Sequence, residues 1–402
     1  MIIHQPEIKI EGNEVLVSTR IEMNGNYSIP KELWFKYPLE YQDAVTDRSD
    51  GFFASLFLLG MHFNEGIEIR GVVSPKIIKN SSVLRSKYLQ HAPKYLNQVD
   101  FNFISEKPTE PNRNRDIRLS SFSGGVDSFY SFWSHFYPEK SAHPVSLTHG
   151  LFIHGYDLVL ENQENYQQFL KEYQTLFADW GLSLIQCSTN AYSFYRLRTP
   201  WIFSNTPTLV GAVLGLCNGA SFFNQPGNYD PDPIDPSLAS SNISLFSTET
   251  TDFFAHGVEL ERSEKINAMR DWYPIQKHMR VCMKMDMNSG MLGCQKCQKC
   301  LNTSLMLNLM DIQEDFLNYK KKFTWINFLQ LCWKSLDIGS FPRRDYFKLM
   351  YSKKRYDLIL LYWIFLPINL LRVFYHKKII PILPKRLVYF VKSLVFPQRA
   401  EN

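Results

Sequence analysis

The sequence predicts an α/β protein with a doubly wound, parallel five-stranded sheet, an α+β N-terminal domain and a helical C-terminal extension. Strands and helices alternate with short connections through the middle of the chain, which is typical of a parallel sheet covered on both faces. A glycine-rich turn and a cysteine cluster lie in this central region. The expected strands are 116–122, 145–154, 182–187, 220–223 and 245–248. The expected domains are 1–114, 115–310 and 311–402.

Before the central region, apolar residues alternate on both sides of Glu11-Gly12-Asn13, which predicts a β-hairpin. Residues 52–63 are apolar enough for a buried helix, and 67–73 predict another strand. We find no catalytic pattern in this first segment. A scaffold role is favoured over substrate selection or self-association.

The turn reads Ser123-Gly124-Gly125-Val126-Asp127-Ser128, between the first expected strand and the expected helix 127–136. Without Cβ atoms, the two glycines let backbone N–H groups bind an anion at the positive end of the helix. The serine hydroxyls add donors, and Asp127 would hold a Mg²⁺ ion or fix the loop. The expected ligand is a nucleoside triphosphate. An ordinary Gly-Gly turn is the alternative.

Four cysteines, Cys282, Cys294, Cys297 and Cys300, follow the pattern C-x11-C-x2-C-x2-C. Four closely spaced thiolates suit one tetrahedral Zn²⁺, and a closed four-sulfur site is typically structural. The alternatives are an iron–sulfur cluster and unrelated buried thiols.

The turn lacks the Walker Lys-Ser or Lys-Thr pair and the dinucleotide G-x-G-x-x-G pattern. It resembles the PP-loop of the ATP pyrophosphatase superfamily, whose fold is adenine-nucleotide hydrolase-like. A PP-loop followed by a four-cysteine knuckle resembles the 7-cyano-7-deazaguanine synthase family over residues 115–309. The resemblance implies that the loop binds the pyrophosphate end of ATP while a substrate oxygen attacks the α-phosphorus. The substrate is then adenylated and pyrophosphate leaves.

The resemblance also implies roles for further residues. Lys265, at a helix start, would reach the phosphates, with Arg262 and Arg280 as weaker candidates, so the expected catalytic set is Asp127, Ser128 and Lys265. By position, the end of strand two would receive adenosine through Ile153, His154 and Asp157. His256, Glu259 and Glu261 could face the acceptor. Residues 1–114 and 311–402 have no counterpart in the family, so the substrate stays open.

We therefore expect an AMP-forming ligase that uses ATP, Mg²⁺ and Zn²⁺. It would adenylate a small acid or carbonyl oxygen, and ammonia or an amine would then give an amide or nitrile. One alternative is thiolation of a nucleic-acid base, with Cys187 or Cys217 as the catalytic cysteine. Another is a nucleotide-binding subunit without turnover, in a membrane-associated or defence assembly.

The end of the chain is basic. Residues 341–402 carry 13 Lys and Arg against 3 Asp and Glu, whereas the whole chain has a net charge of +5. The uncharged run 358–371 is short for a membrane span and contains Pro367. Three roles stay open: packing on the protein, attachment to an anionic membrane surface and, least favoured, nucleic-acid binding. The absence of a signal-peptide pattern and the cysteine usage indicate a cytoplasmic protein, with peripheral membrane attachment as an option.

Overall fold

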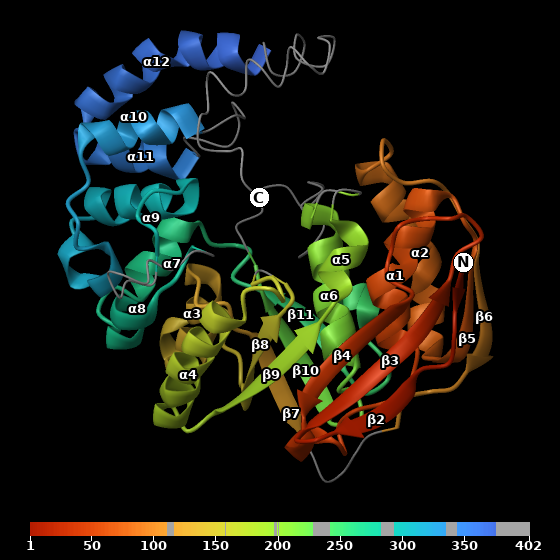
Figure 1. Ribbon diagram of the computed structural model, residues 1–402. Helices are drawn as coiled ribbons and strands as arrows, with labels where there is room; N and C mark the ends of the chain where they lie inside the picture. The colour runs from red at the N-terminus through yellow and green to blue at the C-terminus, as the bar shows by residue number, and fades with distance from the viewer. Residues whose placement is uncertain are drawn as a thin grey trace. The chain divides into compact units, whose positions relative to one another are not determined.

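The computed structural model describes residues 1–110, 116–156, 158–196, 199, 201–227, 242–282, 293–334 and 344–374. Its contacts divide the chain into two units, Met1–Ile275 and Gln276–Asn402. The first unit holds the sheet and the second is helical (Figure 1).

Over the described residues the sheet has eleven strands, so the prediction of five is wrong in number. The strand order is β11-β10-β7-β8-β9-β4-β3-β1-β5-β6, and β2 pairs with β3. In chain order, the strands are β1 (Ile2–Ile3), β2 (Glu7–Glu11), β3 (Glu14–Glu22), β4 (Glu32–Pro38), β5 (Ile67–Val73), β6 (Phe101–Glu106), β7 (Ile117–Ser121), β8 (His149–His154), β9 (Ser183–Thr189), β10 (Ala220–Pro226) and β11 (Asp252–His256).

Five neighbouring strands, β11, β10, β7, β8 and β9, are mutually parallel. The chain runs from β7 through β8 to β9 and then returns to the other side of β7 to form β10. The coarse prediction of an α/β fold with a parallel sheet is confirmed. The excess strands come from the first segment, because β4 pairs antiparallel with β9 through Phe35 and Thr189.

Helices cover both faces of the parallel strands (Figure 1). On one face, α3 (Val126–Phe136) and α4 (Gln163–Asp179) enclose an aromatic core centred on Phe122, whose ring lies 4.9 Å from that of Tyr173 and 5.0 Å from that of Phe177. On the other face, α1 (Asp50–Phe63) and α6 (Trp201–Leu214) pack on a second core of aliphatic and aromatic side chains. The unit also contains α2 (Pro75–His91), α5 (Ala191–Tyr195) and α7 (Arg262–Ala268).

The fifth strand was predicted in the wrong place. Residues Ile243–Phe246 form a 3₁₀-helix, and the strand is β11 at Asp252–His256. Ile243 and Phe246 are buried three residues apart, which fits the 3₁₀ repeat better than the period of two in a strand. A short apolar run does not distinguish the two on its own.

The hairpin, the buried helix and the strand predicted for the first segment are confirmed. Glu11 and Glu14 face each other across the β2–β3 hairpin, with Gly12 at a positive φ of 61°. Helix α1 is buried along nearly its whole length, and β5 covers the expected strand. The domain boundaries at residues 114/115 and 310/311 stay predictions.

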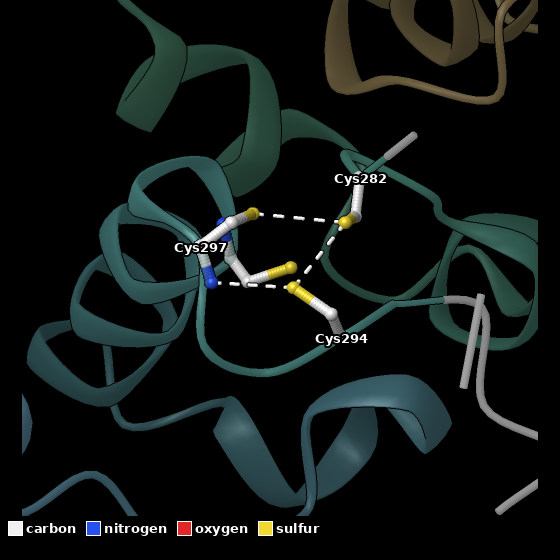
Figure 2. Close-up of side chains that lie close together, drawn as sticks. Cys282, Cys294 and Cys297 are labelled. Carbon is white, nitrogen blue, oxygen red and sulfur yellow. Dashed lines mark hydrogen bonds between the residues drawn. The ribbon is translucent and has the colours of Figure 1, made fainter. Parts of the chain in front are cut away.

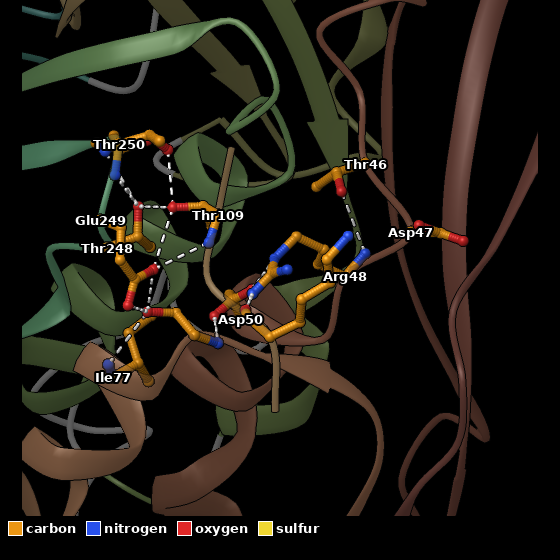
Figure 3. Close-up of polar contacts among 12 residues, drawn as sticks. Thr46, Asp47, Arg48, Asp50, Ile77, Thr109, Thr248, Glu249 and Thr250 are labelled. Carbon is orange, nitrogen blue, oxygen red and sulfur yellow. Dashed lines mark hydrogen bonds and ion pairs between the residues drawn. The ribbon is translucent and has the colours of Figure 1, made fainter. Parts of the chain in front are cut away.

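A polar network joins the first segment to the loop before β11 (Figure 3). Asp50 is fully buried and accepts hydrogen bonds from Arg48 Nε and from the Ser74 amide, both at 2.7 Å. Glu249 accepts from the Lys76 amide at 3.1 Å and the Thr109 amide at 3.0 Å. Lys76 lies in the first turn of α2, so the Glu249 carboxylate accepts from a backbone amide at that helix N-terminus and interacts favourably with the helix dipole. These bonds fix segments far apart in the sequence.

Glycines allow α1 and α6 to approach closely. A Cβ atom at Gly211 of α6 would lie 1.9 Å from Ser55 Oγ and 2.7 Å from Gly51 O, both on α1. No side chain larger than hydrogen fits there unless the helices move apart.

We predict that Gly211→Ala destabilises the first unit by about 1–3 kcal/mol, because overpacking outweighs the gain of about 1 kcal/mol in helix propensity. The melting temperature measured by circular dichroism should fall by several degrees. Gly66→Ala is the control, since its added methyl would meet only Asp100 O at 3.6 Å. An unchanged or raised melting temperature for Gly211→Ala would refute the packing argument.

The second unit contains α9 (Gln298–Leu309), α10 (Trp325–Lys334), α11 (Arg344–Ser352) and α12 (Tyr356–Phe374). Helix α8 (Tyr273–His278) spans the division between the units. Among the described residues, no helix has the length and apolarity needed to cross a membrane.

Candidate functional site

The glycine-rich turn lies at the carboxyl end of β7, where the strand order reverses. The neighbours of β7 are β8 on one side and β10 on the other, and the connections leave it in opposite directions. In open parallel sheets this switch point is where ligands bind. The turn therefore has the position predicted for a phosphate loop.

The backbone of the turn leaves the N-terminus of α3 available to a ligand. Gly124 has a positive φ of 74°, and Gly125 is the N-cap residue, with no side-chain capping bond. The Gly125 amide donates to Ser123 Oγ at 3.3 Å, and Ser128 Oγ donates to Gly125 O at 2.9 Å. The serines thus hold the turn in shape. The first amides of α3 and its dipole favour an anion here.

Asp127 forms ion pairs with two cations from α7. Lys265 Nζ lies 2.7 Å from Asp127 Oδ1, and Arg262 Nη2 lies 3.1 Å from Oδ2. Burial would raise the pKa of Asp127, but the two cations outweigh it and place the pKa below its ordinary value. The carboxylate is therefore ionised at neutral pH, and the three side chains together carry one net positive charge.

Lys265 is held at the switch point although it is only 1% exposed. Its Nζ also donates to Gly227 O at 2.5 Å, directly after β10. A Cβ at Gly257, which has a positive φ of 72°, would lie 3.2 Å from Lys265 Cε. The ends of β10 and β11 thus fix the ammonium beside the turn. The structure brings Lys265, Arg262 and Asp127 together beside the turn, and their roles toward a nucleotide stay predictions.

Sequence reasoning missed polar residues at the end of β10. Asn224 is fully buried, and its Nδ2 donates to Ser120 Oγ of β7 at 3.2 Å. Gln225 Nε2 donates to Thr206 Oγ1 at 3.0 Å. Within the described part of the chain, Asn224 Oδ1 and Gln225 Oε1 have no hydrogen-bond partner. The sequence pattern that could have indicated them is an Asn-Gln pair directly after the expected strand 220–223.

The predicted adenosine residues at the end of β8 have different environments. Ile153 is 8% exposed and belongs to the second core, on which α1 and α6 pack. His154 is buried, stacks on Tyr166 with a centroid distance of 4.2 Å, and has Nε2 3.1 Å from Val159 O. Burial lowers its pKa, so the ring is neutral at neutral pH. Asp157 lies outside the described residues.

A cavity of about 500 Å³ lies beside His154. Its other walls come from β2, β3, β4 and the end of β9. The lining residues are Glu11, Glu14, Leu16, Glu32, Trp34, Lys36, His154, Leu160, Gln163 and Ser188. Lys36 Nζ lies 2.7 Å from Glu11 and 3.9 Å from Glu14, and because three glutamates and one lysine line the cavity, its net charge is negative.

Other candidates have structural roles. His256 is buried, with Nδ1 3.0 Å from Ser131 Oγ and Nε2 2.8 Å from His143 O, so its ring is engaged on both sides. Glu261 caps α7 in a capping box with Glu264. Arg280 Nη1 donates to Cys282 O at 3.3 Å. Among the described contacts, none supports the predicted role of Glu259 facing the substrate that accepts the nitrogen or acyl group.

The four predicted metal ligands converge in the second unit (Figure 2). Their Sγ atoms all lie within 4.8 Å of one another. Cys282 Sγ is 3.4 Å from Cys294 Sγ and 3.6 Å from Cys297 Sγ. Tetrahedral zinc with Zn–S bonds of about 2.3 Å requires sulfurs about 3.8 Å apart, so the cluster fits one such ion.

Backbone amides also point at the sulfurs. The Cys297 amide donates to Cys294 Sγ at 3.2 Å, and the Cys300 amide donates to Cys297 Sγ at 3.4 Å. Such bonds stabilise thiolates. Without a metal, the hydrogen bond with Cys282 and burial raise the pKa of Cys297 to about 11, so a metal must displace thiol protons.

No family model, curated protein or solved structure matches this chain. The case for a function therefore rests on its own residues.

Proposed function

We propose that this protein is an AMP-forming ligase of the PP-loop ATP pyrophosphatase class. The observation that carries the proposal is the turn of residues 123–128 at the switch point, with Lys265 and Arg262 beside it. A reaction that expels pyrophosphate from ATP needs such an arrangement of backbone amides and fixed cations. The resemblance to the 7-cyano-7-deazaguanine synthase family agrees with this class but leaves the substrate open.

In the proposed reaction, the amides of the turn and the dipole of α3 bind the β- and γ-phosphates. A substrate oxygen attacks the α-phosphorus, and the bond from this phosphorus to the bridging oxygen breaks. Pyrophosphate leaves with the bonding electrons, and Lys265 and Arg262 neutralise the charge that develops on it.

Asp127 fits the role of a Mg²⁺ ligand because its carboxylate is ionised and lies in the first turn of α3. Mg²⁺ would screen the phosphates from one another and from Asp127 itself. Lys265 and Arg262 contact the Asp127 carboxylate, so binding of Mg²⁺ and ATP would transfer these cations to phosphate oxygens.

The second half-reaction would form the carbon–nitrogen bond. Ammonia or an amine attacks the adenylated carbon, a proton leaves the nitrogen, and AMP departs with the carbon–oxygen bonding electrons. An amide results. When ammonia is the donor, adenylation of the amide oxygen releases a second pyrophosphate, and loss of AMP and of both nitrogen protons then gives a nitrile. The acid and the nitrogen donor stay open.

Release of pyrophosphate from ATP tests the proposal. Purified protein is incubated with ATP, Mg²⁺, ammonium and pools of small carboxylic acids, and pyrophosphate and AMP are quantified. We expect the two products in equal amounts and only with some pools. ADP and inorganic phosphate instead would contradict the class, and ATP binding without products from any pool would favour the non-catalytic subunit.

Thiolation finds less support. Cys187 is fully buried in β9, and burial holds the pKa of its thiol well above the ordinary value. Burial also raises the pKa of Cys217 to about 12. Neither thiol is a ready nucleophile, because the thiolate is the reactive form.

A further inference from the structure

Helix α12 presents large apolar side chains to solvent along its whole length. They recur at three- and four-residue intervals, which places them along one side of the helix. The exposed fractions are 53% for Tyr356, 62% for Leu360, 58% for Trp363, 61% for Ile364, 49% for Ile368, 71% for Leu371 and 58% for Phe374. We call these seven residues the apolar face of α12.

The opposite side of α12 is already packed within the second unit. Leu358 is fully buried and Tyr362 is 8% exposed. The Tyr362 ring lies 5.2 Å from Phe347 of α11, and Phe365 lies 6.2 Å from Trp333 of α10. The apolar face is therefore additional to the side that holds the helix in place. A contiguous exposed face of this kind marks an interaction surface.

The ends of α12 are basic. Lys353, Lys354 and Arg355 directly precede the helix, and Arg372 lies in its last turn. The acidic residue in the first turn, Asp357, is paired with Arg355, with contacts of 2.9 and 2.8 Å. Lys353 likewise pairs with Asp311, and among the described residues Lys354 has no acidic partner. Over residues 341–402, basic residues outnumber acidic ones by 13 to 3.

We propose that the apolar face of α12 lies on an anionic phospholipid surface. An amphipathic helix with basic residues at its ends binds in this way, with its apolar side chains among the lipid headgroups and upper acyl chains. Trp363, Tyr356 and Phe374 are aromatic residues, and tryptophan and tyrosine favour that interface. The geometry is peripheral, because α12 has 19 residues with Pro367 inside and no described helix can cross a membrane.

Charge favours lipid over a second copy of the chain. An isologous dimer through this face would bring two sets of like basic residues together, which destabilises the contact. An anionic bilayer instead gains attraction from Lys354, which has no acidic partner among the described residues. The basic excess of the surrounding sequence acts in the same direction.

Vesicle flotation tests the proposal with the full chain. Vesicles of equal parts phosphatidylcholine and phosphatidylserine are compared with vesicles of phosphatidylcholine alone. We expect the protein to float with the anionic vesicles and to be released as salt shortens the screening length to about 3 Å at 1 M. Protein that stays at the bottom with both vesicle types would overturn the proposal.

Variants separate the apolar and the electrostatic contributions. The double variant Leu360→Glu and Ile364→Glu should lower the bound fraction at least about tenfold, because two carboxylates enter the apolar contact. Lys354→Gln, which leaves the Lys353–Asp311 ion pair intact, should weaken binding by about fivefold. Ile104→Glu, on β6 and 58% exposed, is the matched control and should bind like the wild type. Equal binding of the double glutamate variant would refute this face as the contact.

Two further readouts exclude a different occupant. Anionic vesicles should shift the tryptophan emission of the wild type to shorter wavelength, and Trp363→Phe should lose most of that shift. Sedimentation velocity without lipid should give a monomer. A dimer that Leu360→Glu and Ile364→Glu dissociate would assign the face to a second copy and overturn the lipid proposal.

Discussion

Lys265→Met is expected to lower the rate of pyrophosphate release by about 100- to 1000-fold, the cost of removing one fixed donor from a charge-stabilising site. The variant keeps the length of the side chain but removes the ammonium that contacts Asp127 and Gly227 at the switch point. The measurement is pyrophosphate released from ATP with an acid pool that supports turnover by the wild type.

The control for Lys265→Met is Lys171→Met, at an exposed position of α4, which should retain full activity. Circular dichroism should show a folded Lys265→Met protein, because Arg262 still pairs with Asp127. Turnover at the wild-type rate in folded Lys265→Met would remove Lys265 from the proposed site.

Cys300→Ser is expected to abolish metal binding and to unfold the helices around the cysteine cluster. Cys300 is fully buried, and four thiolates are needed to close the tetrahedral site. In small zinc domains, metal binding contributes about 10–16 kcal/mol to folding, so its loss cannot be offset by the packing of a few short helices. The measurements are metal content per chain and helical ellipticity, which a strong chelator should lower in the wild type too.

Cys332→Ser is the matched control, since Cys332 is a buried cysteine of the same unit that is not in the cluster. It should retain one metal ion per chain. A purified wild-type protein that is folded but metal-free would contradict the structural metal, and iron with visible absorption would assign a cluster instead of zinc.

The sequence could predict the features that depend on local pattern. The glycine pair between an alternating strand and a helix with i, i+3, i+4 periodicity placed the turn at the end of β7. The spacing of the four cysteines predicted their convergence. The turn can be predicted because its pattern lies within a few consecutive residues. The cysteine cluster can be predicted because four cysteines rarely occur so close together unless they bind a metal.

What the sequence could not predict depends on distant pairing. Strand β4 joins β9 through Lys36 and Ser188, and nothing near either residue indicates this partner. The first segment was therefore predicted as a domain with its own fold, and the sheet was too small by six strands. Lys265 was assigned to the phosphates and Asp127 to a Mg²⁺ ion or to the loop, but their direct ion pair links residues 138 positions apart, which no local pattern indicates.

The spacing of apolar residues in the sequence also did not predict which side of α12 would be buried. The run 358–371 is uncharged on every side, so the pattern could not separate the side that packs on α10 and α11 from the apolar face. That distinction comes from the burial of Leu358 beside the exposure of Leu360. Buried polar groups such as Asn224 were missed because their environment, and not their spacing, makes them unusual.

Binding of an ATP analogue with a methylene bridge between the α- and β-phosphates tests the central claim most directly, since it requires no knowledge of the acid. Calorimetric titration in the presence of Mg²⁺ should give one site per chain in the wild type. Gly124→Val should lose this site, because Gly124 has a φ of 74° that valine does not adopt without strain. No binding by the wild type, or unchanged binding by folded Gly124→Val, would contradict a nucleotide site at this turn.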